Sequence, residues 1–397
     1  MNRYCLIVVI VAVLARPEPL ESQVFRLDAN LELTGASFDP TSEPERNINT
    51  NFRDDDPFNP VRAKLFPHFS LNETFGIEGE VLFDNKAKKF DRSGNGQVRI
   101  DGLFAFVHGL FENRLNFWLG RIPTPVGTFS ARSYSHVNPL IGYPLAYQYK
   151  VPYNAFALAS ESGNLYLRDH NFGAATAIYE ACWITGLSAF GTLGGIDYNV
   201  AIGRGTLTNP EAAANHGFQL AGRIGRKFSE KLTLGISGGI APYLEKDIGL
   251  PAGTGIRDPK HVIVGLDARV DIDNGHLIGE FFSNSWDTPQ YEFEKSIRAY
   301  TWYIEGQYRF VQKMFVAARL DQMLYSEITD PSTGQETSWG YGVTRIEGGL
   351  GFQPVQELVM KAVVQHNMLD NPAKESITIL ALQAAFHFKD VQTLGHL

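Results

Sequence analysis

The side chains that most often catalyse reactions or hold metal ions are few in this sequence, and their spacing suits neither role. The ten histidines form no HxH or HExxH pattern, and the two cysteines, Cys5 and Cys182, form no CxxC or CxxCH motif. The segment 235–239 matches G-x-S-x-G, which acts at a turn from a strand into a helix, but here it lies inside an alternating strand pattern. We therefore expect no enzyme, no metal site and no cofactor.

Charged residues instead recur at every second position of many segments, which is the spacing of one face of a β-strand. In a closed barrel such faces would line the lumen. Basic and acidic residues are nearly balanced on them, so no ladder of one sign predicts selectivity for anions or cations. The lumen-lining candidates are Arg62, Lys64, Glu78, Glu80, Arg99, Asp101, Asp267, Arg269, Glu305, Arg309, Arg345 and Glu347. The same parity also selects Arg26, Asp28, Glu32, Asp197, Arg223, Asp271, Arg319, Asp321 and Lys361. A second interpretation is that most of these charges pair across the wall and stiffen it.

Period-two alternation of apolar and polar residues predicts β-strands along the whole chain. The segment 25–34 alternates strictly, and similar patterns recur at 262–272, 301–310 and 358–367. The Ala- and Gly-rich segment 172–190 is poorly patterned, and a strand there is assumed. Short turns alternate with long polar connections, as they do in outer-membrane barrels. The count comes to about sixteen antiparallel strands, with both termini on the side of the short turns.

A closed sheet is the one β-structure that pairs every backbone polar group inside a lipid bilayer. The alternation then puts one face of each strand toward lipid and the other toward a water-filled lumen. We therefore predict an all-β transmembrane barrel, with a soluble β-sandwich as the alternative. The net charge is −8 and there is no dense run of Lys or Arg, so a nucleic-acid partner is not expected.

Residues 1–22 have the character of a signal peptide. Arg3 precedes the apolar run 5–15, which is too short to cross a bilayer core of about 30 Å but suits a secretory signal. A buried hydrophobic strand is the alternative. The predicted organisation is a signal peptide at 1–22, a barrel at 23–388 and a C-terminal tail at 389–397.

The last predicted strand alternates and ends in aromatic residues. It resembles the closing strand of Gram-negative outer-membrane proteins, which the assembly machinery of such barrels reads. The resemblance implies that Phe386 and Phe388 form the assembly signal and that the protein resides in the cell outer membrane. The tail 389–397 departs from the usual pattern, in which the chain ends at the aromatic residue.

A second resemblance lies in the segment 115–133. It is similar to the LGRxxTPxG segment of monomeric and phosphate-selective-type porins, in which a strand runs out into a long loop. Gly120, Arg121, Pro125 and Gly127 occupy the matching positions.

The connection 123–165 that follows this segment is predicted to narrow the pore. Its part from 123 to 153 contains five tyrosines, several prolines and glycines, and few charges. In porin-like proteins such a loop often folds into the lumen, so the constriction candidates are Arg132, Tyr134, His136, Tyr147 and Tyr149. The alternative is an external cap that packs on itself or on a neighbouring subunit.

Together these features favour an outer-membrane porin, which is a channel for passive diffusion of small hydrophilic solutes or ions. The expected partners are the lipid bilayer, the assembly machinery and the solutes, and a homo-oligomer or a periplasmic partner is compatible with the sequence. The alternative function is a barrel sheath around another protein, such as a multihaem cytochrome of an electron conduit. A barrel protease or phospholipase would need a His–carboxylate or Ser–His constellation, and none is evident.

Overall fold

The computed structural model describes residues 24–39, 42–50, 56–84, 97–151, 176–178, 183–207, 216–244, 250–289, 295–329 and 334–390. The predicted signal peptide 1–22 lies outside these residues, as does most of the predicted tail 389–397.

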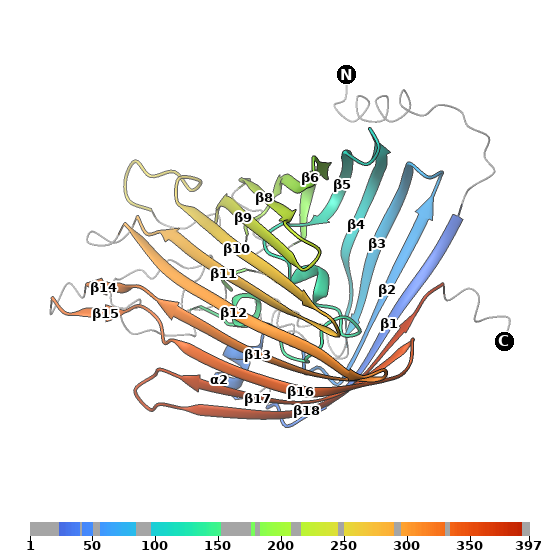
Figure 1. Ribbon diagram of the computed structural model, residues 1–397. Helices are drawn as coiled ribbons and strands as arrows, with labels where there is room; N and C mark the ends of the chain where they lie inside the picture. Colours follow the sequence, from blue (N-terminus) through green and yellow to red (C-terminus); the bar gives the residue numbers. More distant parts are fainter. Residues whose placement is uncertain are drawn as a thin grey trace, which may run out of the picture.

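The described chain is almost entirely β-structure (Figure 1). The strands of its first half are β1 (Val24–Ala36), β2 (Val61–Ser70), β3 (Phe75–Asp84), β4 (Gln97–Leu110), β5 (Leu115–Pro123), β6 (Trp183–Leu193), β7 (Ile196–Arg204), β8 (Phe218–Lys227) and β9 (Leu232–Pro242). Those of its second half are β10 (Lys260–Ile272), β11 (Gly275–Asp287), β12 (Ser296–Val311), β13 (Met314–Tyr325), β14 (Glu327–Thr329), β15 (Glu336–Ser338), β16 (Val343–Val355), β17 (Leu358–Leu369) and β18 (Ser376–Phe388). The short helices are α2 (Glu43–Asn49), α3 (Leu145–Gln148) and the 3-10 helix η1 (Ser130–Arg132).

All strands except β14 and β15 form one closed barrel, in which each strand pairs with its neighbours in the chain and β18 pairs with β1. Every pairing is antiparallel, and at the closing seam Leu33 of β1 lies opposite Ala384 of β18. The strands β14 and β15 form a separate hairpin within the connection from β13 to β16. The predicted sixteen-stranded antiparallel barrel is therefore confirmed.

The connections differ between the two ends of the barrel. One end has only tight turns, such as Gly194–Gly195 between β6 and β7, where both residues have positive φ angles of 58° and 78°. A two-residue hairpin turn of this type needs that conformation, and glycine adopts it without strain. The strand that the sequence left poorly defined at 172–190 is β6, which the structure describes from Trp183 to Leu193. The predicted end of the preceding connection at residue 165 lies outside the described residues.

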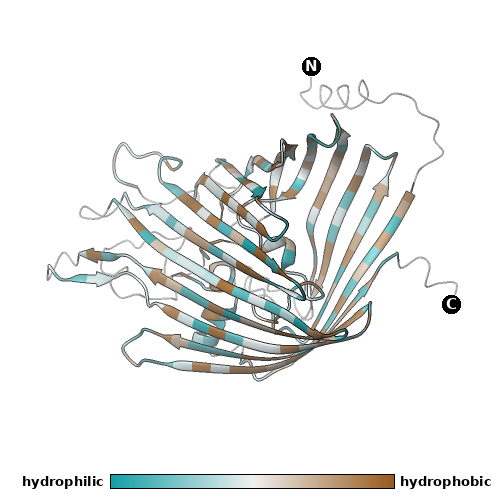
Figure 2. Cartoon of the chain, in the orientation of Figure 1, coloured by the Kyte–Doolittle hydropathy of each residue, from teal (hydrophilic) through white to brown (hydrophobic). Residues whose placement is uncertain are grey.

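The outer wall is apolar, as a membrane barrel requires. In β10, Val264 and Leu266 point outward and are half exposed, whereas Ile263 and Asp267 on the other face are buried. Figure 2 shows the resulting alternation of brown and teal along the strands. A β-sandwich would bury its apolar faces, so the alternative fold is wrong. Among the described residues, no helix combines the length and hydropathy needed to cross a membrane.

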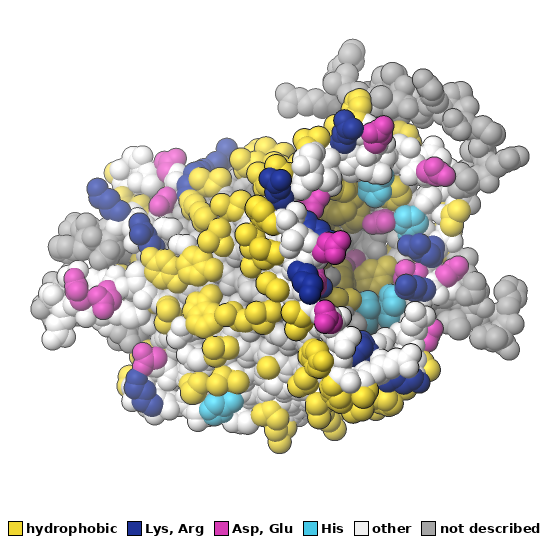
Figure 3. All heavy atoms as spheres, in the orientation of Figure 1, with side chains coloured by type: hydrophobic (Ala, Val, Ile, Leu, Met, Phe, Trp, Pro, Cys, Tyr) yellow, Lys and Arg dark blue, Asp and Glu magenta, His cyan; other side chains and the backbone are white. Residues whose placement is uncertain are grey.

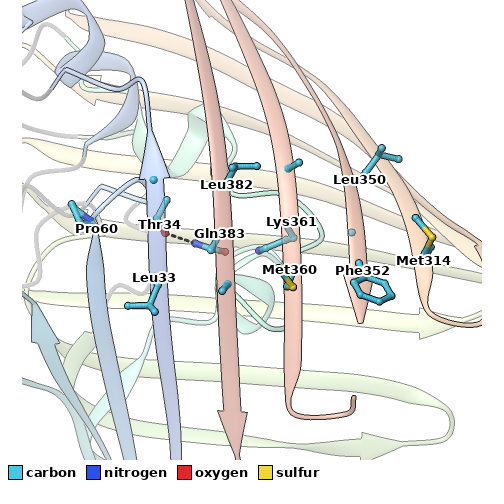
Figure 4. A pocket seen from close by; sticks show the side chains of 14 residues that line it. Leu33, Thr34, Pro60, Met314, Leu350, Phe352, Met360, Lys361, Leu382 and Gln383 are labelled. Atoms are coloured by element: carbon cyan, nitrogen blue, oxygen red, sulfur yellow. Dashed lines mark hydrogen bonds between the residues drawn. The ribbon is translucent and has the colours of Figure 1, made fainter. Parts of the chain in front are cut away.

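The seam between β1 and β18 illustrates both faces of the wall (Figure 4). Thr34 and Gln383 face the interior and are joined across the seam by a hydrogen bond of 3.0 Å. Their neighbours Leu33 and Leu382 are exposed on the outside, where β1 and β16–β18 enclose an apolar hollow of about 560 Å³.

Candidate functional site: a loop folded into the barrel

The connection after β5 enters the barrel and crosses it. Residues 124–151 contain η1 and α3, and Leu140, Leu145 and Tyr147 are completely buried. Gly127 allows the tight entry, because its φ is +71° and a side chain there would collide with the Tyr147 hydroxyl. Figure 1 shows this green segment inside the ring of strands. We call residues 124–151 the lumen loop.

A guanidinium of the barrel wall holds the centre of the lumen loop. Arg319 of β13 contacts Glu305 of β12 at 3.0 Å and Glu347 of β16 at 2.5 Å, and all three side chains are fully buried. The same guanidinium donates to the carbonyl oxygen of Gly142 at 2.7 Å. Arg132 of the loop completes the cluster with a contact of 2.7 Å to Glu305. Charges buried this deeply are tolerated only when they are paired and hydrogen bonded.

Carboxylates of the wall accept hydrogen bonds from the loop backbone. Glu347 accepts the N–H of Gly142 at 2.7 Å, and Asp321 accepts the N–H of Leu145 at 2.6 Å. Glu280 of β11 accepts both the N–H and the hydroxyl of Thr128. These bonds satisfy backbone groups of an irregular segment that lies away from bulk water.

Basic side chains of the wall donate hydrogen bonds to carbonyl groups of the loop, whereas the acidic ones accept from its N–H groups. Lys361 of β17 donates to the carbonyl oxygens of Ser135, Asn138 and Leu140, at 2.8, 3.1 and 2.9 Å. Arg345 of β16 donates to the carbonyl oxygen of Tyr143 at 2.7 Å. Most of these polar wall groups therefore hold the loop by its backbone.

Three tyrosines of the lumen loop donate hydrogen bonds to acidic side chains or to a backbone carbonyl group. Tyr134 donates to Glu80 at 2.9 Å, and Glu80 also pairs with Lys64 at 2.8 Å. Tyr147 donates to Glu280 at 2.9 Å, and burial followed by the charge of Glu280 raises the pKa of Tyr147 well above its usual value. Tyr149 donates to the carbonyl oxygen of Tyr341 at 3.1 Å.

Among the constriction candidates, His136 is the residue whose surroundings disfavour the protonated form of its side chain. Its ring stacks on that of His387 from β18, with centroids 4.0 Å apart and planes within 5° of parallel. Burial, then the nearby His387 and Lys361, lowers the pKa of His136 to about 4. The imidazole of His136 is therefore neutral in the docked loop at neutral pH.

Acidification should loosen this part of the loop. His136 is neutral in both the docked and the released loop above about pH 6.5. Between pH 6.5 and about 4 the released loop gains a proton that the docked loop excludes, so docking weakens as the pH falls. Amide hydrogen exchange of residues 130–140, corrected for the intrinsic rate, should rise over that interval and rise less in His136→Gln. An equal rise in both proteins would contradict the prediction.

The structure places the lumen-lining candidates in three ways. Those that face the lumen loop or its rim are buried: Arg62, Lys64, Glu80, Asp101, Asp267, Glu305, Arg345 and Glu347. Glu78 and Arg99 are partly buried and pair with His68 and Asp101. Arg269 and Arg309 lie near the tight-turn end, and Arg269 pairs with Asp271 at 2.7 Å in a half-exposed position. Phe386 and Phe388 stack side by side at the end of β18, with centroids 6.2 Å apart.

Sequence parity missed Glu280, which is central to the site. It shares the inner face of β11 with Ile278 and Phe282, which are buried because the lumen loop packs against them. An inner face with apolar residues resembles an outer face, so alternation alone did not select it. The signal that could have found Glu280 is a charged residue on a strand with two apolar faces.

Among the described residues, two cavities lie between the lumen loop and the wall. One, of about 310 Å³, is bounded by β1–β4, β18 and the loop residues Tyr134 and His136. The other, of about 430 Å³, is bounded by β6–β8 and the loop residues Pro125 and Gly127. Figure 3 shows a hollow in which histidine, acidic and basic side chains gather beside hydrophobic ones.

No protein-family model and no curated protein sequence matches the chain. Solved structures do match it along most of its length. An anion-selective porin from Comamonas acidovorans has a TM-score of 0.56 at 10% identity and covers 92% of this chain and 99% of its own. OmpF of Salmonella typhi, in complex with daunomycin, has a TM-score of 0.55 at 12% identity, covering 92% and 97%. The outer membrane protein OmpT of Vibrio cholerae has a TM-score of 0.53 at 11% identity, covering 94% and 100%. At these identities the similarity establishes the fold.

Proposed function

We propose that this chain, which has the barrel fold of bacterial outer-membrane porins, forms a narrow channel for passive diffusion of small hydrophilic solutes or ions across the outer membrane. The observation that carries the proposal is the lumen loop, which narrows the barrel and leaves polar cavities beside the wall. Arg132, Tyr134, His136, Tyr147 and Tyr149 would set the width of the constriction. Solutes and ions would pass through the space between the lumen loop and the barrel wall.

Most of the charges along the cavities are paired, which supports weak selectivity. Lys64 pairs with Glu80 at 2.8 Å, and Arg223 pairs with Asp267 at 2.6 Å. Adjacent opposite charges cancel at the distance of a passing ion, so the field along the path has no dominant sign. The proposed channel therefore accepts neutral solutes and ions of either sign.

Single-channel recording in planar bilayers tests the proposal. Protein whose folding is verified by heat-modifiable gel mobility should give stable current steps, with a reversal potential near zero in a salt gradient. A strongly shifted reversal potential would overturn weak selectivity. The absence of current from folded protein would overturn the channel itself.

The lumen loop also bears on the alternative of a sheath around a partner protein. Such a partner would need the space inside the barrel, and the chain's own loop packs there against β8–β13 and β16–β18. This observation speaks for the channel. Purification of the native protein with a coloured haem partner would instead support the sheath.

A further inference from the structure

The connection from β1 to β2 also enters the barrel. It contains α2, and Ile48 and Asn49 at the end of this helix are completely buried, while Phe58 farther along is 2% exposed. Figure 1 shows α2 in blue within the ring of strands. We call the described residues of this connection, 43–50 and 56–59, the latch segment. A second connection therefore shares the lumen with the lumen loop.

Apolar side chains of the latch segment pack on two separate parts of the lumen loop. Ile48 is buried in one cluster with Leu145 and Tyr149 of the loop. Phe58 belongs to another cluster, in which it lies with Leu140 of the loop. The latch segment thus covers the part of the loop that contains α3 and the part that precedes it.

The end of α2 obtains its hydrogen-bond donors from the lumen loop and the wall. The last carbonyl groups of a helix have no partner within the helix. Here the N–H of Lys150 in the lumen loop donates to the carbonyl oxygen of Asn47 at 2.8 Å. The guanidinium of Arg345 donates to the carbonyl oxygen of Ile48, and to the side-chain oxygen of Asn49 at 3.2 Å. Both donors are therefore committed to α2 in the position that the structure shows.

Two buried arginines of the wall each join the latch segment to Tyr143 of the lumen loop. Arg345, which binds the end of α2, also donates to the carbonyl oxygen of Tyr143 at 2.7 Å. Arg62 of β2 donates to the carbonyl oxygen of Asp56 at 2.9 Å and to the hydroxyl of Tyr143 at 3.3 Å. Loss of a partner from a buried donor is costly, so the departure of one segment weakens the docking of the other.

We propose that the latch segment keeps the lumen loop docked and that its release switches the channel to a wider state, an inference that rests on the proposed channel and names its regulation. The segment lies at the end of the barrel opposite the tight turns, and its release breaks no pairing between wall strands. Docked and released forms then coexist, and the contacts of α2 set their ratio.

Amide hydrogen exchange of the folded full-length chain in detergent micelles tests the latch without requiring conduction. Ile48→Ser removes the apolar contact of α2, so exchange at Gly142 and Leu145 of the lumen loop should accelerate about tenfold or more. Asn49→Ala removes only an acceptor of Arg345 and should accelerate it about threefold. This milder variant carries the test if Ile48→Ser does not fold by heat-modifiable gel mobility.

The matched control is Ile256→Ser. Ile256 belongs to the connection from β9 to β10 and packs, partly buried, against the cluster that contains Ile48. Because it lies outside the latch segment, exchange at Gly142 and Leu145 should stay as in the unmodified chain. Equal acceleration by Ile256→Ser and Ile48→Ser would overturn the proposal, since it would reflect a general loosening of the cluster.

Single-channel recording distinguishes a latch from a segment that only fills space. Ile48→Ser should make the current switch between the unmodified step and a larger one. In a chain whose residues 129–148 are replaced by a glycine–serine linker, the same substitution should add no switching, because there is no docked loop to release. An equal, steady rise of conductance in both chains would overturn the latch.

The two readouts separate the latch from the channel. Faster exchange in Ile48→Ser and Asn49→Ala, without current from any folded variant, would keep the latch and overturn the channel. Current from the unmodified chain, with exchange unchanged in both variants, would keep the channel and overturn the latch.

Discussion

Arg319→Met should lower the free energy of unfolding by about 3–5 kcal/mol, the usual cost of breaking a buried ion pair on one side. The guanidinium neutralises Glu305 and Glu347, and neither carboxylate reaches solvent. After the substitution Glu305 keeps Arg132, but Glu347 keeps only neutral donors from Gly142 and Gln365. Equilibrium unfolding in urea of the micelle-bound protein measures the loss.

The matched control applies the same substitution to an exposed ion pair. Arg269→Met breaks the contact between Arg269 and Asp271. Both side chains are more than 40% exposed, so the loss in free energy of unfolding should stay below about 1 kcal/mol. Adding Glu347→Gln to Arg319→Met should recover part of the stability, because the uncompensated charge is removed while an oxygen remains for the N–H of Gly142. Equal losses for Arg319→Met and Arg269→Met would contradict the assigned role of Arg319.

Replacing residues 129–148 with a glycine–serine linker of equal length should raise the single-channel conductance by about twofold or more, because pore width sets the ion flux. The replaced residues include η1, α3 and the segment that Lys361 and Arg345 hold by its carbonyl groups. Without those contacts and without its buried aromatic side chains, the segment has no reason to stay docked. Current steps in planar bilayers, at fixed salt and voltage, measure the effect.

The control replaces an exposed loop in the same way. Residues 251–255 lie between β9 and β10 and are exposed except for the half-buried Thr254, so a linker there should leave the conductance unchanged. If the replacement of 129–148 leaves the conductance as it was, the lumen loop is not the constriction. If both replacements raise it equally, the effect reflects a general loosening of the barrel.

The sequence was sufficient for the barrel because the signals involved are local. Alternation with period two and the contrast between tight turns and long connections are readable within ten to twenty residues. They yielded the sixteen strands and their antiparallel order, and they assigned Glu305, Arg345 and Glu347 to the inner face. The one poorly placed strand, β6, was the one whose alternation is diluted by glycine and alanine.

The docking of the lumen loop was decided only by the tertiary structure. Leu145 bonds to Asp321, 176 residues away, and Gly142 bonds to Glu347, 205 residues away. Nearly every residue carries the same backbone N–H and C=O groups, so the residue types in the loop do not indicate which wall side chains they will bind. For the same reason, the sequence indicated that charged residues line the lumen, but only the tertiary structure showed that they form hydrogen bonds with the backbone of the lumen loop.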